Sequence, residues 1–127
     1  MKPEIKTSTW PNGQKSLEIP YVNGQRHGFA TYWNENGQKR YEIPYVNGQQ
    51  YGLATGWHTN GQKRYEIPYI NGQRHGLITE WFSDGLLRYV EKMHQNQMVW
   101  RILFPSQEQI LENAEVELFF HEIPYLI

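Results

Sequence analysis

The sequence predicts an all-β protein, folded as an up-and-down meander of stacked antiparallel β-hairpins in one coiled sheet. The first observation behind this prediction is a segment of ten residues that occurs three times, beginning at Ile19, Ile43 and Ile67, so that the period is 24 residues. A fixed period of this size is typical of stacked arrays, in which each unit buries its apolar face against its neighbours. The second observation is a series of regularly spaced Asn-Gly turn signals.

These turn signals define where the strands end. Asn-Gly is a strong hairpin signal because a type I′ turn requires positive φ at both central residues. The pairs begin at Asn12, Asn23, Asn36, Asn47, Asn60 and Asn71, with Asp84-Gly85 as a seventh turn. The gaps alternate between 11 and 13 residues, and the next short gap predicts an eighth turn at Gln95-Asn96. We therefore expect roughly eight strands.

Two other repeat architectures do not fit the residues between the turns. A helical solenoid needs apolar residues three to four positions apart, whereas these segments alternate with period two. A leucine-rich repeat has a similar length, but its regularly spaced leucines are missing from this sequence.

The 127 residues are expected to form a single domain with four segments. Residues 1–18 form a partial repeat, in which the turn after Trp10 is one residue shorter than the turns that follow the later tryptophans. Residues 19–90 contain three repeats, residues 91–104 a degenerate repeat, and residues 105–127 a C-terminal cap.

The expected cap combines a short helix and a terminal strand. Ser106 and Gln109 form a capping-box pattern, which predicts a helix to about Asn113. Glu115 to Phe120 is interpreted as the final strand, and Glu122 to Tyr125 repeats Glu-Ile-Pro-Tyr once more. Because an open sheet edge invites unwanted pairing, we expect this segment to cover the last strand.

Pairing residues across the turns assigns the side chains to two faces. Across Asn47-Gly48, Ile43 should meet Gly52 and Tyr41 should meet Ala54. Across Asn60-Gly61, Trp57 should pair with Arg64 and Thr55 with Glu66. One face, the Tyr face, then carries Tyr41, Ile43, Tyr45, Tyr65, Ile67 and Tyr69 over Gly52, Ala54 and Gly56. The other, the Trp/Arg/Thr face, carries Phe29, Thr31, Trp33, Leu53, Thr55, Trp57, Leu77, Thr79 and Trp81 between Arg40, Glu42, Arg64 and Glu66.

Each repeat also contains a proline inside an expected inner strand, at Pro20, Pro44 and Pro68. Proline has no N–H group to donate to the ladder, so inner strands seldom contain it. We expect a bulge or a sharp bend at each proline, which makes the sheet coil.

Charge is distributed unevenly along the chain. Residues 1–101 carry all 12 Lys and Arg and eight of the 13 acids, a balance of +4. Residues 102–127 carry the other five acids and neither Lys nor Arg, a balance of −5. This acidic segment is either ordinary solvated surface or a contact for a basic partner, which it would attract and select.

Tyr-x-Asn-Gly-Gln-x-x-Gly, then Trp, then Asn-Gly-Gln-Lys at a period of 24 residues resembles the MORN repeat in its bacterial variant form, from about Trp10 to Tyr89. The chain departs from the usual pattern in having Phe29, Leu53 and Leu77 after the first repeat glycine, and Ile-Pro before the tyrosine. The resemblance implies stacked β-hairpins. It also implies an antitoxin or immunity role, as described for many small bacterial members, or a scaffold or membrane-associated role, as in eukaryotic members.

The sequence contains no recognisable catalytic, metal or cofactor motif, and we expect no enzyme. His27 and His75 share one repeat position, but Tyr51 occupies it in the middle unit, and the other histidines lack ligand spacing. Glu42 and Glu66 are two copies of one structural position. No serine lies in a nucleophile elbow, and no glycine turn has a phosphate-loop pattern.

Composition also disfavours several kinds of partner. A pI near 6.5 lacks the basic excess used to bind nucleic acid. No run approaches the ~18 apolar residues of a membrane helix, and no signal peptide or cysteine is present, so we expect a cytoplasmic protein without stable membrane insertion.

The sequence therefore favours a non-enzymatic protein-binding module, interpreted as an antitoxin or immunity protein that binds a cognate protein toxin such as a nuclease. The alternative is a structural scaffold that assembles with itself, for example as a homodimer through an open sheet edge; a phospholipid-binding module is a third. The candidate partner-binding residues are Trp33, Trp57, Trp81, Arg40, Arg64, Glu108, Glu112, Glu115 and Glu117.

Overall fold

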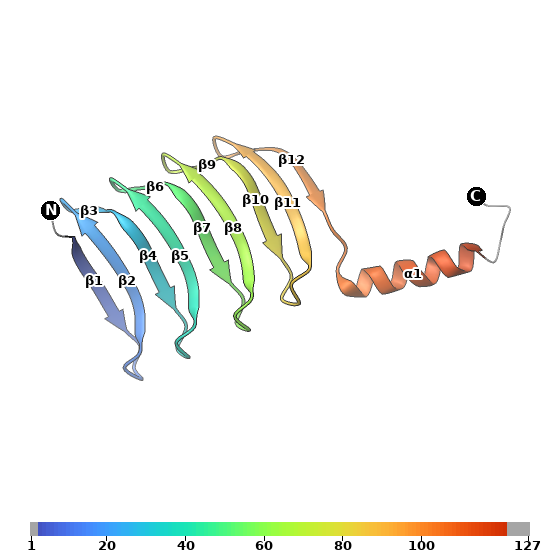
Figure 1. Cartoon of the computed structure of the whole chain (residues 1–127), viewed down its shortest axis with the longest axis horizontal. Coiled ribbons are helices and arrows are strands. Elements are labelled where there is room, and N and C mark those ends of the chain that lie inside the picture. Colours follow the sequence, from blue (N-terminus) through green and yellow to red (C-terminus); the bar gives the residue numbers. More distant parts are fainter. Residues whose placement is uncertain (1–2, 122–127) are drawn as a thin grey trace.

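The computed structural model describes residues 3–121, which form one open antiparallel sheet followed by a helix (Figure 1). The predicted all-β meander is confirmed. Its strands are β1 (Glu4–Thr9), β2 (Lys15–Val22), β3 (Gln25–Arg26), β4 (Gly28–Trp33), β5 (Lys39–Val46), β6 (Gln49–Gln50), β7 (Gly52–Trp57), β8 (Lys63–Ile70), β9 (Gln73–Arg74), β10 (Gly76–Trp81), β11 (Leu87–His94) and β12 (Gln97–Leu103). The helix is α1 (Gln107–His121).

Each strand pairs with its neighbours in the sequence, in the order β1-β2-β4-β5-β7-β8-β10-β11-β12. The short strands β3, β6 and β9 pair with the strand before them and lead into β4, β7 and β10. The path of the described sheet therefore has nine successive strands, one more than the roughly eight expected. The difference arises because the N-terminal partial repeat supplies a complete hairpin of β1 and β2.

Two kinds of turn alternate along the sheet. The turns at Asn23, Asn47 and Asn71 have positive φ at both central residues, with φ of 52°, 48° and 50° at the asparagine, as type I′ geometry requires. The eighth turn is confirmed at Gln95-Asn96, where φ is 48° and 65°.

The other four turns are longer than the two-residue turns expected from Asn-Gly. In the first of them the Trp10 N–H donates to the Gln14 carbonyl at 2.7 Å and the Gly13 N–H donates to the Trp10 carbonyl at 2.9 Å. The Asn12 side chain accepts the Gln14 N–H at 2.9 Å, so asparagine is used here for its oxygen. Because this extra residue shifts the register, Trp57 lies opposite Lys63, and the predicted pair with Arg64 is wrong.

The N-terminal turn is no shorter than the others. Trp10 makes the hydrogen bonds that Asn34, His58 and Phe82 make in the later turns, so it stands at their position, one residue beyond the column of Trp33. The predicted shorter first turn is therefore wrong, because Trp10 does not correspond to Trp33.

The bulges expected at the prolines are present and shift the register by two residues. The Tyr51 N–H donates to the Pro44 carbonyl at 3.1 Å, and Pro20 and Pro68 accept equivalent bonds at 3.0 Å. The N–H and C=O of one residue point to the same side of an antiparallel strand, so each proline lacks its donor on the side of the bulge. Tyr41 consequently lies opposite Gly56 and Glu42 opposite Thr55, which corrects the predicted pairs Ile43–Gly52 and Tyr41–Ala54.

A glycine closes each bulge onto the proline. Gly28, Gly52 and Gly76 have φ of 107°, 109° and 105°, where other residues are strained. A Cβ on Gly52 would lie 3.2 Å from Pro44 Cγ, so the site also has no room for a larger side chain.

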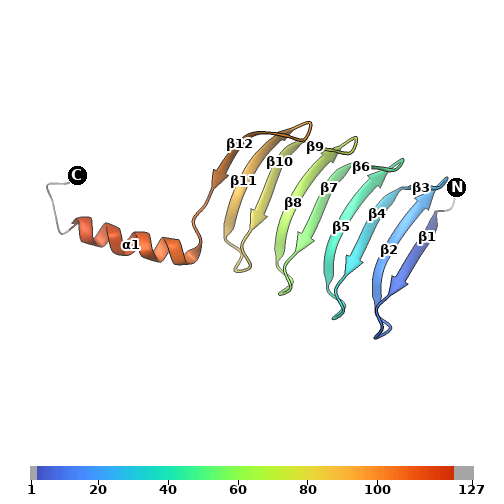
Figure 2. The ribbon, with the colours of Figure 1, turned by 180° about the vertical axis from the view of Figure 1, so that it is seen from behind.

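The Tyr face contains the core. Ala54 pairs with Ile67, Gly52 with Tyr69 and Gly56 with Tyr65, as predicted. The buried apolar side chains lie in rows across this face, at Ile19, Ala30, Ala54, Ile78 and Met93. Figures 1 and 2 show no second layer on either side of the sheet within residues 3–121, so this core depends on neighbouring strands alone.

The C-terminal segment differs from the expectation. The capping box is confirmed, since the Ser106 N–H donates to Gln109 Oε1 at 2.9 Å and the Gln109 N–H donates to Ser106 Oγ at 3.3 Å. The helix continues to His121, so the strand predicted from Glu115 to Phe120 is wrong; Glu115, Glu117 and Leu118 are good helix formers and extend the helix that starts at Gln107. Glu122 to Tyr125 lies outside the described residues.

The predicted cap over the last strand is also wrong for the described part of the chain. Figure 1 shows that α1 leads away from the sheet, and residues 107–121 leave the outer edge of β12 uncovered.

The Gly56→Ala substitution should lower the free energy of unfolding by about 1–3 kcal/mol, because the added methyl group would overlap the Tyr65 ring. φ at Gly56 is not positive, so the effect isolates this contact. Chemical denaturation of a double-mutant cycle with Tyr65→Ala should show a smaller effect of Gly56→Ala once the ring is removed. Equal effects in both backgrounds would contradict the packing.

Candidate protein-binding surface

The Trp/Arg/Thr face carries a row of exposed apolar side chains. Phe29, Leu53 and Leu77 are 54%, 46% and 53% exposed. Phe29 lies opposite Pro44, which is buried, and Leu53 lies opposite Pro68, which is half-buried, so the exposed side chains alternate with less exposed prolines. Because the three side chains occupy the same position of successive repeats, they recur on every second strand, about 9–10 Å apart.

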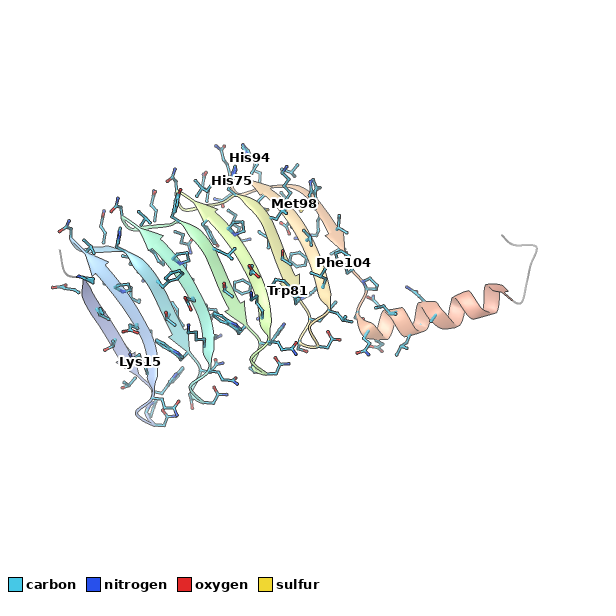
Figure 3. All side chains as sticks on the ribbon, in the orientation of Figure 1. Lys15, His75, Trp81, His94, Met98 and Phe104 are labelled. Carbon is cyan, nitrogen blue, oxygen red and sulfur yellow. The ribbon has the colours of Figure 1, made fainter. Side chains whose placement is uncertain are left out.

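A second row beside it consists of tryptophan, lysine and glutamate. The ammonium groups of Lys15, Lys39 and Lys63 lie 5.6, 5.9 and 5.9 Å from the ring centroids of Trp33, Trp57 and Trp81. Figure 3 labels its two ends, Lys15 and Trp81.

The same lysines form ion pairs within their own strands. Lys39 Nζ lies 2.7 Å from Glu42 Oε2, and Lys63 Nζ lies 3.0 Å from Glu66 Oε1. Exposed pairs of this kind add little to stability, so their main effect is to hold the side chains in order. A repeated row of cation, ring and carboxylate was expected, but its cation is lysine, whereas arginine was predicted.

The two candidate arginines, which were expected on the Trp/Arg/Thr face, contact side chains of the Tyr face. The Arg40 guanidinium lies 5.0 Å from the Tyr41 ring centroid, and Arg64 Nε lies 3.7 Å from Glu80 Oε1. Together with Trp57 they line a shallow hollow of about 340 Å³. The structure therefore brings Arg40, Arg64 and Trp57 together, although neither arginine covers the Trp57 ring.

The acidic candidates lie elsewhere. Glu108 and Glu112 are exposed on α1 and line a groove of about 960 Å³ between the start of the helix and the Phe82 turn. Glu115 and Glu117 follow in the same helix. Figure 1 shows α1 beyond the last strand, so Glu108 and Glu112 lie on a different surface from the tryptophan row.

Sequence reasoning missed two buried carboxylates on the Tyr face. Glu91 is 6% exposed and accepts hydrogen bonds from Arg101 at 2.6 and 2.9 Å. Glu80 is 9% exposed and accepts one from Arg88 at 3.3 Å. Both interrupt the repeat, since Glu91 stands where other units have isoleucine and Glu80 where they have tyrosine or glycine. Both carboxylates could have been found from the sequence, because each replaces the repeat residue at a position that faces the core.

These carboxylates change the titration of their neighbours. Burial, helped by a hydrogen bond to Glu80, raises the pKa of Tyr89 to about 12. The hydrogen bond from Arg101 to Glu91 raises the pKa of the Arg101 guanidinium further above its usual range. Both arrangements stabilise the fold.

Neither a cluster of metal ligands nor a membrane-spanning helix is found among the residues that the structure describes. Among residues 3–121 no three His, Cys, Asp or Glu side chains converge as metal ligands would. Within the same part of the chain, no helix has the length and apolar character that crossing a membrane requires.

An open sheet of stacked hairpins with one packed face and one exposed face is the architecture of a repeat-based binding or scaffold module. Comparison with protein families agrees, because residues 26–47 and 50–71 each match the MORN repeat variant. The resemblance to MORN repeats is thus confirmed for these two stretches. A search of curated proteins gives no match.

The Tyr89→Phe variant should lose less thermal stability than the parent protein between pH 10 and about 12. Tyrosine in the unfolded chain releases its proton near pH 10, whereas Tyr89 in the folded chain holds it until about pH 12. The raised pKa therefore stabilises the fold fully below pH 10, and this contribution disappears as the pH rises through 12. Melting temperatures across this range measure the effect, with Tyr51→Phe at a half-exposed ring as the control. Parallel curves for the parent and Tyr89→Phe would contradict the assignment.

Proposed function

We propose that the protein is a non-enzymatic binding module whose Trp/Arg/Thr face contacts another protein. The observation that carries the proposal is the exposed row of Phe29, Leu53 and Leu77 beside the ordered tryptophan row. Soluble proteins rarely leave a contiguous apolar patch exposed unless it binds something. Tryptophan is also among the residues most enriched at interface hot spots.

The shape of the molecule favours the same surface. The Tyr face is filled by its own rings and aliphatic side chains, and Ala30 and Ile78 there are almost completely buried. The opposite face has an apolar row near the start of β4, β7 and β10 with Lys–Glu pairs alongside, which corresponds to the apolar core and polar rim of a protein interface.

Within this class we propose an antitoxin or immunity protein that neutralises a cognate toxin by direct binding. Support comes from the resemblance to bacterial MORN-variant proteins and from the acidic groups on α1. Exposed carboxylates such as Glu108 and Glu112 would attract a toxin with a basic substrate-binding cleft, as a nuclease has. A scaffold that assembles with itself is the second candidate, and the uncovered apolar edge of β12 favours it.

A tagged pull-down of the full chain from its native host, followed by mass spectrometry, tests the proposal. One small stoichiometric partner that is toxic alone and harmless with this chain would support the immunity role. A stoichiometric partner without toxicity would leave the binding module and remove the immunity role. Recovery of this chain alone would contradict both and favour the scaffold.

The Leu53→Lys substitution should weaken partner binding at least about tenfold, or roughly 1.4 kcal/mol, because it places a charge in the centre of the apolar row. Leu86→Lys is the matched control, since Leu86 is 41% exposed but lies in a turn at the other end of the strands. Isothermal titration calorimetry with the recovered partner gives both affinities. An equal loss in the two variants, or none, would place the interface elsewhere.

Replacing Glu108 and Glu112 together by glutamine should slow association with a basic partner and leave dissociation nearly unchanged, because these exposed charges act mainly by long-range attraction. The difference should fade as salt rises, since screening shortens the range of the attraction. Surface plasmon resonance at two salt concentrations measures both rates. Unchanged association at low salt would show that the acidic helix is only solvated surface.

A further inference from the structure

The two edges of the sheet differ in character. β1, at the first edge, reads Glu-Ile-Lys-Thr-Ser-Thr, with the charged and polar residues that usually protect an edge. β12, at the last edge, is exposed along its whole length and has a single charge, at Arg101. Its apolar side chains Met98, Val99, Trp100, Ile102 and Leu103 are 56%, 57%, 40%, 51% and 70% exposed. An unprotected apolar edge is expected to pair with another strand.

The backbone of β12 is oriented for such pairing. The Phe104 N–H donates to the Arg88 carbonyl at 2.9 Å and therefore points inward, toward β11. Because the direction alternates along a strand, the N–H groups of Arg101 and Leu103 point to the open side. Residues 3–121 supply no partner strand there.

The repeat indicates which strand is missing. β12 begins at Gln97, 24 residues after Gln73, so it corresponds to the first strand of each unit. In the other units this strand pairs with one that contains Glu-Ile-Pro-Tyr and an apolar residue, as β4 pairs with β5. That sequence begins at Glu18, Glu42 and Glu66, and it occurs once more from Glu122 to Leu126. The helix α1 is inserted between the two halves of this last unit.

We propose that residues 122–127 of a second copy add a strand to the edge of β12, and that two copies exchange these segments reciprocally. The second copy is favoured because α1 has 15 residues, a length of ~22 Å, and leads away from the sheet (Figure 1). α1 begins shortly after β12 and ends at His121, directly before this segment. The length of the helix therefore separates the segment from the β12 of its own chain.

The side chains of the segment suit this edge. In the repeats Ile43 and Tyr45 lie on the Tyr face, and Arg26 donates a hydrogen bond to the Tyr45 hydroxyl at 3.1 Å. On β12 the residues of that face are Arg101 and Leu103, opposite Glu91 and Tyr89. Antiparallel addition with the same parity allows the register in which Ile123 lies beside Leu103 and Tyr125 beside Arg101, which pairs an apolar group with an apolar group and a ring with a guanidinium.

Light scattering after size-exclusion chromatography tests the proposal on the full chain, which should be a dimer. A chain that ends at His121 lacks the added strand and should be a monomer. Leu103→Pro removes an outward N–H and should also give a monomer. Mixing these two variants should restore a one-to-one dimer, because one retains a free edge and the other retains the segment; this restoration also shows that both variants fold.

Engineered cysteines distinguish exchange from self-covering, since the chain has no cysteine of its own. Leu103→Cys combined with Ile123→Cys should give a disulfide between two chains under mild oxidation. A disulfide within one chain, a monomeric full-length protein, or a dimer that persists after removal of residues 122–127 would each overturn the proposal. Lys6→Cys on β1 combined with Ile123→Cys is the control and should not cross-link.

Strand exchange at β12 is independent of partner binding by the Trp/Arg/Thr face. The Leu103→Pro variant should lose the dimer and keep the row of Phe29, Leu53 and Leu77. Dimerisation and partner binding can therefore be measured separately, and either proposal can fail while the other holds.

Discussion

The contact between a proline and a glycine within each unit determines how the sheet is built. At Pro44 the strand lacks a donor, the adjoining chain bulges away from it, and Gly52 closes the bulge with a φ of 109°. The bulge adds two residues to one strand and so preserves the alternation of the side chains. The tryptophan and lysine rows can therefore remain on one face through several units while the tyrosines and small residues remain on the other.

Units are joined to their neighbours by hydrogen bonds between turns as well as by the ladder. The Gly48 N–H donates to the Arg26 carbonyl at 2.9 Å, and the Gly72 N–H donates to the Gln50 carbonyl at the same distance. At the other ends of the strands Trp10 Nε1 donates to the Trp33 carbonyl at 3.1 Å. With a single layer and a thin core, each unit depends on its neighbours, and the units at the edges are the least supported.

Repetition made most of the fold predictable. Turn positions, strand parity, the bulges and the eighth turn at Gln95-Asn96 all follow from residues that recur at a fixed period. Errors arose where the same dipeptide serves two turn types: Asn47-Gly48 forms a two-residue turn, whereas Asn60-Gly61 belongs to a longer one. The segment beyond Pro105 has no second copy nearby. The capping box predicted where its helix begins, but the predicted end at Asn113 lies eight residues before the observed end at His121.

The candidate surface was predictable in outline only. Trp33, Trp57 and Trp81 lie on one face as expected, because parity alone decides this. The side chains that lie over these rings are determined by a one-residue shift of the strand register at the longer turns. The sequence does not reveal this shift. Glu80 and Glu91 were missed because reasoning from the consensus overlooks the positions that depart from it.

Protein binding by this sheet requires that one face remains available for another protein while the other face is filled by its own side chains. Hydroxyl-radical footprinting of the protein alone and of its complex from the native host measures this directly. Phe29, Leu53 and Leu77 should be modified in the free protein and protected in the complex, while Ile19 and Ile78 should resist modification in both. Protection confined to other residues, or extensive modification of Ile19 and Ile78 in the free protein, would contradict the account.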